Sequence, residues 1–187
     1  MDERSLIARI KEAFAKVPYP GDEHILHCSY DKQWGGTLNG PCRECGEAIQ
    51  YFKGKGQMAH VPGELGWMSF ALASFTPEAF LYWLPAFLEV AIVDPDEGSS
   101  VSESLLFRFQ SLQSEQWQKE RFKQLSNEQL NVVEDYFELE KERLLRRMDA
   151  KGFPVVDRDT VDPDIAAALE TLKKERESRE LLTGRWS

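Results

Sequence analysis

The chain lacks the features that mark secreted, nucleic-acid-binding or disulfide-stabilised proteins. Only three of its 187 residues are cysteines, and so small an odd number argues against a disulfide framework. Lys and Arg number 23 against 32 Asp and Glu, which gives a net charge of −9. Nucleic acids and anionic membranes attract proteins with excess positive charge. We therefore expect the protein to bind neither of them.

Long apolar runs are also missing. The most apolar stretch, residues 67–93, is interrupted by serine, threonine, glutamate and proline, and no unbroken run approaches the roughly 18 residues of a membrane span. Residues 1–16 carry charge throughout and contain no apolar signal-peptide core. We therefore expect a cytoplasmic protein. We also expect the aromatic side chains of residues 67–87 to lie in its core.

Common catalytic motifs are absent as well. The sequence contains no G-x-G-x-x-G, no H-E-x-x-H and no G-x-S-x-G. Gly54-Lys55-Gly56 lacks the spacing of a phosphate-binding loop. His60 has no evident partner that would make it a general base. These absences favour a protein without enzymatic activity.

The sequence is rich in helix signals. Apolar residues recur at helical spacing in residues 3–16, 76–92, 100–112, 126–150 and 164–182, and residues 42–52 suit a further short helix. Thr76-Pro77-Glu78 combines an N-cap, a first-turn proline and a first-turn acid, and residues 100–103 and 126–129 have capping-box patterns. We predict a mainly α fold: a compact helical domain of five to six helices with an irregular N-terminal segment that zinc could stabilise.

The helix pattern also suggests a division of the chain. We assign residues 1–156 to a single helical domain, which includes the cysteine and histidine segment 24–60. Residues 157–187 then form a C-terminal helical extension. After Leu172 this last helix has almost no apolar residue before Leu181, so its second half is either exposed to solvent or part of a partner interface.

A cluster of cysteine and histidine residues is the most specific feature of the chain. Its members are His24, His27, Cys28, Cys42 and Cys45. Zinc prefers four thiolate or imidazole ligands arranged as a tetrahedron. In the C-x-x-C-G sequence of residues 42–46, two intervening residues allow a tight turn to direct both sulfurs toward one ion, and the glycine can adopt a positive φ. The cluster therefore predicts a zinc site.

The second pair of ligands is left open by the sequence. It is either His24 with His27 or His24 with Cys28, because the adjacent His27 and Cys28 side chains point in different directions. Four protein ligands would leave no position for water, so such a zinc ion would be structural. Two alternatives remain: free thiols beside surface histidines, and a redox C-x-x-C pair. The redox pair lacks the preceding strand of a thioredoxin-like site.

The central aromatic segment resembles a known sequence signature. Residues 75–88 read FTPEAFLYWLPAFL, which resembles the F-(T/S)-P-E-A-F-x-Y-(Y/W)-L-P-A-(Y/F)-L pattern of a bacterial family known only as a domain of unknown function. Cys42-x-Glu44-Cys45 and Phe52-x-Gly54-Lys55 resemble two upstream elements of that family. A tryptophan often follows the second element, and here Gly56 takes its place. The resemblance spans about residues 3–140 and implies no activity.

Acidic side chains form the candidate partner-binding surface. They are Asp94, Asp96 and Glu97 on one predicted turn, and Glu134, Asp135, Glu138 and Glu142 on one predicted helix. Negative charge accelerates association with a basic protein. We therefore expect a protein-binding module, most concretely an immunity or antitoxin-like protein that neutralises a basic effector. The alternatives are a metal-dependent enzyme, or a thiol or zinc sensor, built on the cysteine and histidine cluster.

Overall fold

The computed structural model describes residues 2–94, 99–110, 116–152 and 162–183. Within these ranges the chain forms nine α-helices and one short 3₁₀-helix, with two isolated β-bridges and no β-strand. The α-helices are α1 Glu3–Phe14, α2 Arg43–Phe52, α3 Pro62–Trp67, α4 Ala71–Ser74, α5 Pro77–Val93, α6 Ser99–Gln110, α7 Gln116–Gln124, α8 Asn127–Ala150 and α9 Pro163–Thr183. The predicted mainly α class is confirmed. The helices exceed the six predicted segments by three. Helices α3 and α4 are too short to show a periodic pattern, and α7 begins at Gln116, beyond the helix predicted over residues 100–112.

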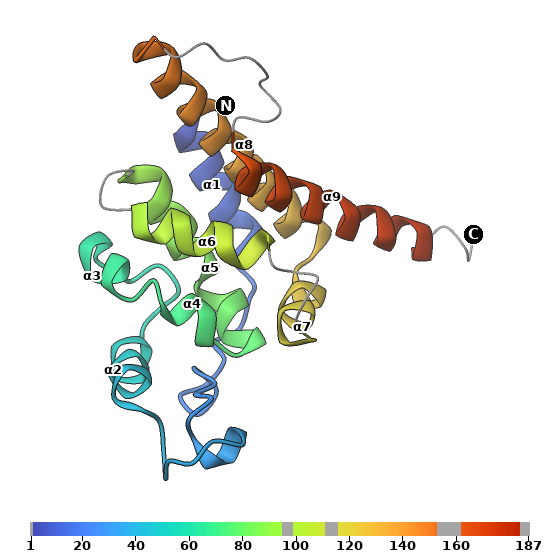
Figure 1. The fold of residues 1–187 in the computed structure, drawn as a ribbon. Helices are drawn as coiled ribbons and strands as arrows, with labels where there is room; N and C mark the ends of the chain where they lie inside the picture. The colour runs from blue at the N-terminus through green and yellow to red at the C-terminus, as the bar shows by residue number, and fades with distance from the viewer. Residues whose placement is uncertain (1, 95–98, 111–115, 153–161, 184–187) are drawn as a thin grey trace.

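Helix α5 lies at the centre of the fold (Figure 1), with α1, α3, α6, α7 and α8 packed on it. It begins as predicted, because the Thr76 hydroxyl accepts a hydrogen bond from the Ala79 N–H at 3.1 Å. The helix continues through Pro85 to Val93. None of the described helices combines the length and the apolar character needed to cross a membrane.

The aromatic segment is core only in part. Phe75, Phe80, Trp83 and Phe87 are completely buried, as predicted. For Trp67 and Phe70 the prediction is wrong, because their side chains are 84% and 39% exposed, the first at the end of α3. The error at Trp67 arises because α3 is only six residues long and ends at this residue, so no helical periodicity shows which of its side chains are buried.

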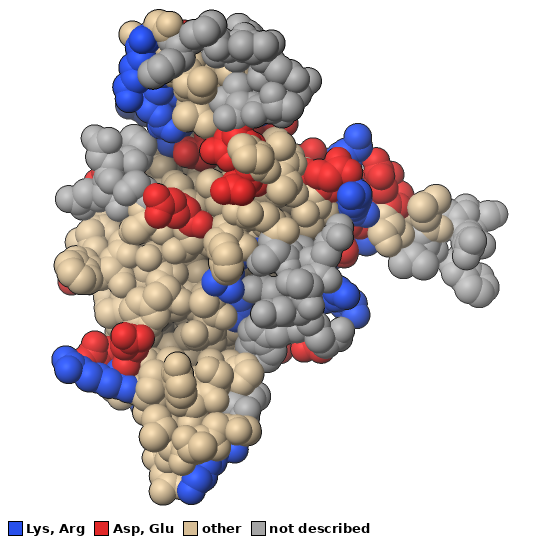
Figure 2. Space-filling model, viewed as in Figure 1, with Lys and Arg blue, Asp and Glu red and all other residues tan. Residues whose placement is uncertain are grey.

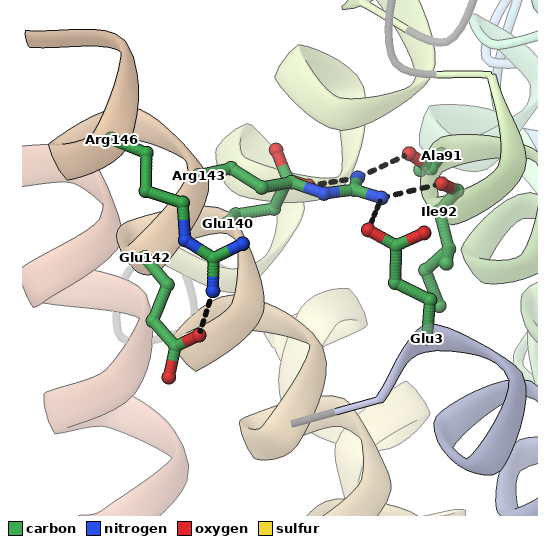
Figure 3. Close-up of polar contacts among 7 residues, drawn as sticks. All are labelled: Glu3, Ala91, Ile92, Glu140, Glu142, Arg143 and Arg146. Carbon is green, nitrogen blue, oxygen red and sulfur yellow. Dashed lines mark hydrogen bonds and ion pairs between the residues drawn. The ribbon is translucent and has the colours of Figure 1, made fainter. Parts of the chain in front are cut away.

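An arginine of α8 stabilises the C-terminal end of α5 (Figure 3). The Arg143 guanidinium donates hydrogen bonds to the carbonyls of Ala91 and Ile92, at 3.1 and 2.6 Å, and pairs with Glu3 and Glu140, both at 2.8 Å. The last carbonyls of a helix have no partner within the helix. Arg143 supplies the missing donors and joins α5, α8 and the start of α1.

A second arginine stabilises the junction between α4 and α5. Arg121 of α7 is completely buried, and its guanidinium donates hydrogen bonds to the carbonyls of Leu72 and Ala73, each at 2.9 Å, and to that of Phe75. The same group lies 5.3 Å from the centre of the Phe80 ring. Arg121 therefore fixes α7 against the chain where it enters the central helix.

The two predicted capping boxes have different outcomes. At the start of α8, the Ser126 hydroxyl and the Gln129 side chain exchange hydrogen bonds with each other's backbone N–H, as predicted. The predicted box at residues 100–103 is wrong, because α6 already begins at Ser99. The Ser100 hydroxyl instead donates to the carbonyl of Gly66 at 3.4 Å, which links α6 to α3.

Helix α9 packs against α6 and α8. Ile165, Ala168 and Leu172 in its first half join the hydrophobic core, whereas Leu181 near its end is 72% exposed. Arg176 pairs with Glu134 of α8 at 2.5 Å. The predicted domain boundary between residues 156 and 157 lies outside the described residues.

Candidate metal centre

The segment that carries Cys28 is anchored to the start of α5. The His27 N–H donates to the carbonyl of Ser74 at 2.6 Å, and the Thr76 N–H donates to the carbonyl of Ile25 at 3.1 Å. These backbone bonds connect segments separated by about fifty residues. They place Cys28 beside the core, where its side chain is 2% exposed.

The loop between Cys28 and Cys42 folds back through a tight turn. The Asp31 N–H donates to the carbonyl of Cys28 at 2.9 Å, and the Leu38 N–H donates to that of Tyr30 at 2.8 Å. Gly36 passes so close to this backbone that a Cβ atom there would lie 2.1 Å from the Tyr30 carbonyl carbon. Only glycine fits at this position, which explains one residue of the Gly-Gly pair.

Helix α2 positions the other two cysteines. Cys42 occupies the N-cap of α2, and Cys45 lies in its first turn and is 8% exposed. The N-terminus of a helix carries a partial positive charge that favours thiolates. Both sulfurs of the C-x-x-C pair therefore lie at the end of the helix that suits a negatively charged ligand.

The three cysteine sulfurs converge on one point. They all lie within 4.8 Å of one another, close enough to hold a metal ion. The Cys42 N–H also donates a hydrogen bond to the Cys28 sulfur at 3.3 Å. Sulfurs bound tetrahedrally to zinc at 2.3 Å are separated by about 3.8 Å, so only small side-chain movements separate this arrangement from that of a metal centre.

The thiols differ in their tendency to ionise. Burial raises the pKa of Cys28, but hydrogen bonds from the backbone N–H groups of Cys42 and Tyr30 and from the Cys45 and Cys42 thiols together bring it below its usual value. For Cys45, burial and then its hydrogen bonds with the other two cysteines raise the pKa. Cys28 is therefore the thiol that the protein environment prepares for the thiolate form.

Neither predicted histidine belongs to the group of three sulfurs. His24 is exposed, and it lines a hollow of about 440 Å³ together with Cys28, Asp22 and Asp31. His27 is half-buried, and burial followed by the positive charge of Arg121 lowers its pKa. The structure thus unites Cys28, Cys42 and Cys45. The participation of either histidine as a fourth ligand stays a prediction.

The third histidine has a buried environment that the sequence does not reveal. His60 packs against the rings of Tyr51 and Phe52, with its Nδ1 atom 3.3 Å from the Tyr51 hydroxyl. Burial, with a further contribution from the charge of Lys55, lowers the pKa of His60 to about 4. His60 is therefore neutral in the folded protein at pH values where a free histidine is charged.

This shift predicts a pH dependence of stability. Because the pKa of His60 is about 4 when folded and 6.5 when unfolded, its contribution is fully present above pH 6.5 and is lost as the pH falls toward 4. We expect the native protein to lose about 2 kcal/mol over this range relative to His60→Phe, after allowing for partial exposure. Urea unfolding of both proteins at several pH values measures this difference. Parallel pH profiles would contradict the assignment.

The predicted partner-binding acids are largely engaged within the chain. On α8, Glu134 pairs with Arg176, Asp135 pairs with Arg9 at 2.6 Å, and Glu142 pairs with Arg146 at 3.3 Å, the last of which Figure 3 shows.

The remaining predicted acids have different surroundings. Glu138 is exposed, and Asp94 ends α5. Asp96 and Glu97 lie outside the described residues. Acidic side chains do gather over α8 and α9 (Figure 2). Three of the four predicted on α8, however, pair with an arginine of another helix or of the next turn of α8. Their role in partner binding stays a prediction.

Fold and site together define a small helical protein with a candidate three-cysteine metal centre at the start of α2. The chain belongs to DUF6714, a family of unknown function whose sequence model matches residues 2–151. The resemblance to an uncharacterised family is thereby confirmed, and α9 lies beyond the matched region. The comparisons with curated proteins and with solved structures give no match.

Proposed function

We propose that the protein is a non-enzymatic binding module that presents an acidic surface to a basic protein partner, as an immunity or antitoxin-like protein does. The distribution of charge carries this proposal. Between Lys55 and Arg108 the chain contains no Lys or Arg, whereas it contains seven Asp and Glu residues. Although Glu89 in this stretch pairs with Lys11 and Glu64 lies near Lys55, an excess of acids accelerates encounter with a partner of opposite sign. The stretch includes α3, α4, α5 and most of α6.

We further propose that Cys28, Cys42 and Cys45 bind a structural zinc ion. The support is the spacing of the three sulfurs, the N–H donated to Cys28, and the burial of two of the three side chains. An ion there would connect the segment anchored on α5 to the first turn of α2. Such a link would hold the irregular N-terminal segment in place, because that segment contains no helix longer than three residues between α1 and α2.

A metal-dependent enzyme or thiol sensor is the second candidate, favoured by the hollow beside Cys28 and the lowered pKa of its thiol. A catalytic ion keeps an open coordination position, whereas a structural ion does not. Cobalt-substituted protein separates the two, because an added anion such as thiocyanate changes the visible spectrum only when a position is open. An unchanged tetrahedral spectrum supports the structural role.

Salt-dependent capture tests the binding proposal. Immobilised protein is expected to retain a basic protein from extracts of its own source cells at low salt and to release it at high salt. A variant with Glu64→Gln, Glu78→Gln and Glu103→Gln should retain less. The matched control carries the same change at three exposed acids outside the stretch and outside the predicted partner-binding set, Glu12, Glu128 and Glu177. The proposal would be contradicted if the amount of retained protein were the same at low and high salt, or if basic proteins were not preferred.

A further inference from the structure

The three cysteines at the start of α2 form a group of thiols that can react with one another as well as with a metal. All three are free thiols, and their sulfurs lie within 4.8 Å of one another. A disulfide brings two sulfurs to about 2.05 Å and their Cβ atoms to about 3.5–4.5 Å. Rotation of the side chains closes much of the remaining gap between the sulfurs. A covalent bond within the group is therefore an alternative to a bound ion.

Cys28 and Cys42 are the pair best placed to form this bond. The Cys42 N–H donates a hydrogen bond to the Cys28 sulfur at 3.3 Å, and the two thiols are also hydrogen-bonded to each other. Cys28 lies on an irregular segment, and Cys42 precedes the first helical residue of α2. Cys45 lies inside the helix and is 8% exposed. Its backbone therefore has less freedom to adjust to a new bond.

Small molecules can approach this pair from solvent. Cys42 is the most exposed of the three cysteines, and Cys28 lines the hollow of about 440 Å³ described above. Three acidic side chains and no Lys or Arg are among the described residues that line this hollow, namely Asp22, Glu23 and Asp31. Lys53 lies 3.7 Å from Asp22, which leaves an excess of negative charge. A small uncharged oxidant such as hydrogen peroxide therefore suits the hollow better than an anionic one.

We propose that hydrogen peroxide, or another small hydroperoxide, converts Cys28 and Cys42 into a reversible disulfide. First, the Cys42 sulfur attacks a peroxide oxygen, so that an S–O bond forms, the O–O bond breaks, and the departing oxygen takes the thiol proton and leaves as water. Second, the Cys28 sulfur attacks the Cys42 sulfur, so that the S–S bond forms, the S–O bond breaks, and a second water leaves. In total, the two thiols lose two electrons and two protons, and one hydrogen peroxide is reduced to two waters.

The disulfide and a bound metal ion exclude each other. A metal ion needs the sulfurs as thiolates, and the disulfide leaves only Cys45 free. Oxidation therefore releases zinc, while the covalent bond keeps the Cys28 segment joined to the start of α2. A dithiol reductant returns both thiols by thiol–disulfide exchange. This inference rests on the three-cysteine centre proposed above and develops its sensor role, because it names the reacting thiols and the oxidant.

Disulfide mapping in the unaltered chain tests the inference. The protein is treated with excess hydrogen peroxide, its remaining thiols are blocked with iodoacetamide in urea and chelator, and it is digested with trypsin. Trypsin cleaves after Lys32 and Arg43, so the three cysteines lie on three separate peptides. Mass spectrometry should show the Cys28 and Cys42 peptides joined and Cys45 carrying the blocking group. Before the blocking step, a metal indicator should record one zinc released per disulfide, and dithiothreitol should restore all three thiols.

Two variants separate the roles of the thiols. Cys45→Ser keeps the proposed pair and should form the disulfide to the same extent as the native chain. Adding Cys28→Ser to this variant leaves Cys42 without a second thiol. Peroxide should then oxidise Cys42 to sulfinic acid, which dithiothreitol does not reverse. Circular dichroism verifies that each variant is folded, and the mapping of the native chain depends on neither of them.

The inference would be overturned if all three cysteines of the metal-free protein still carried the blocking group after peroxide treatment. It would also be overturned if the joined peptides were those of Cys42 and Cys45, or if the bond linked two chains and doubled the mass without reductant. Protein that binds zinc but resists peroxide after chelation would refute the disulfide and preserve the zinc centre. Protein that forms the disulfide but never binds zinc would refute the zinc centre alone.

Discussion

Removal of zinc by a chelator is expected to lower the free energy of unfolding by about 4 kcal/mol, the value for a site occupied at about a thousand times its Kd. The three sulfurs connect Cys28, which is anchored on α5, to the first turn of α2. Without an ion, this connection depends on hydrogen bonds among the three cysteines, including the one that the Cys42 N–H donates to the Cys28 sulfur. Metal analysis should give one zinc per chain, and urea unfolding with and without chelator measures the loss.

Single substitutions locate the effect. Cys28→Ser, Cys42→Ser and Cys45→Ser should each abolish stoichiometric zinc, because three thiolates provide most of the binding. Arg43→Ser is the matched control, since it lies in the same turn of α2 with an exposed side chain paired to Glu47. The site would be refuted if the purified protein contained no transition metal and if neither chelator nor added zinc changed its free energy of unfolding.

The fourth ligand is resolved by a second pair of variants. His24→Ala should weaken zinc binding if the predicted histidine completes the tetrahedron, whereas Asp31→Asn should do so if a carboxylate takes that position. Both residues line the hollow beside Cys28. His27→Ala tests the second predicted histidine in the same way, because neither histidine belongs to the group of sulfurs and either one stays a candidate fourth ligand.

The long helices could be predicted from the sequence because their signals are local. The cap at Thr76 and the capping box at Ser126 each act through a hydrogen bond three residues away. Helix α5 is apolar nearly all round and therefore had to be buried on most sides. Helix α4, by contrast, contains four residues, and no periodicity can be seen over one turn.

Only those ligands of the candidate site that lie close together in the sequence could be predicted to share an ion. The C-x-x-C spacing of Cys42 and Cys45 shows in the sequence which sulfurs can share an ion. The position of Cys28 beside this pair depends on backbone bonds between its segment and residues at the start of α5, some fifty positions away. The sequence also does not show which surface charges are paired within the chain, because the pairing of Glu134 with Arg176 arises from packing between α8 and α9. The exposure of Trp67 is likewise set by how α3 meets α5.

Arg121→Met is expected to lower the free energy of unfolding by about 3–5 kcal/mol. The guanidinium is completely buried and donates to three carbonyls at the junction of α4 and α5. A hydrogen bond from a charged donor contributes about 1.5–3 kcal/mol, and carbonyls left buried without a donor add a cost of their own. Methionine fills much of the same volume, so the loss measures the donors more than the packing. Urea unfolding at neutral pH gives the value.

Two further variants separate the role of the guanidinium from that of its charge. Arg121→Lys keeps the charge but presents one compact ammonium group, which cannot reach three carbonyls in the geometry of a planar fork. It should recover only a small part of the loss. Arg146→Met, the matched control, removes an arginine from an exposed pair with Glu142 and should cost less than about 1 kcal/mol. Equal losses at the two arginines, or full recovery by lysine, would show that the carbonyls at the start of α5 do not depend on Arg121.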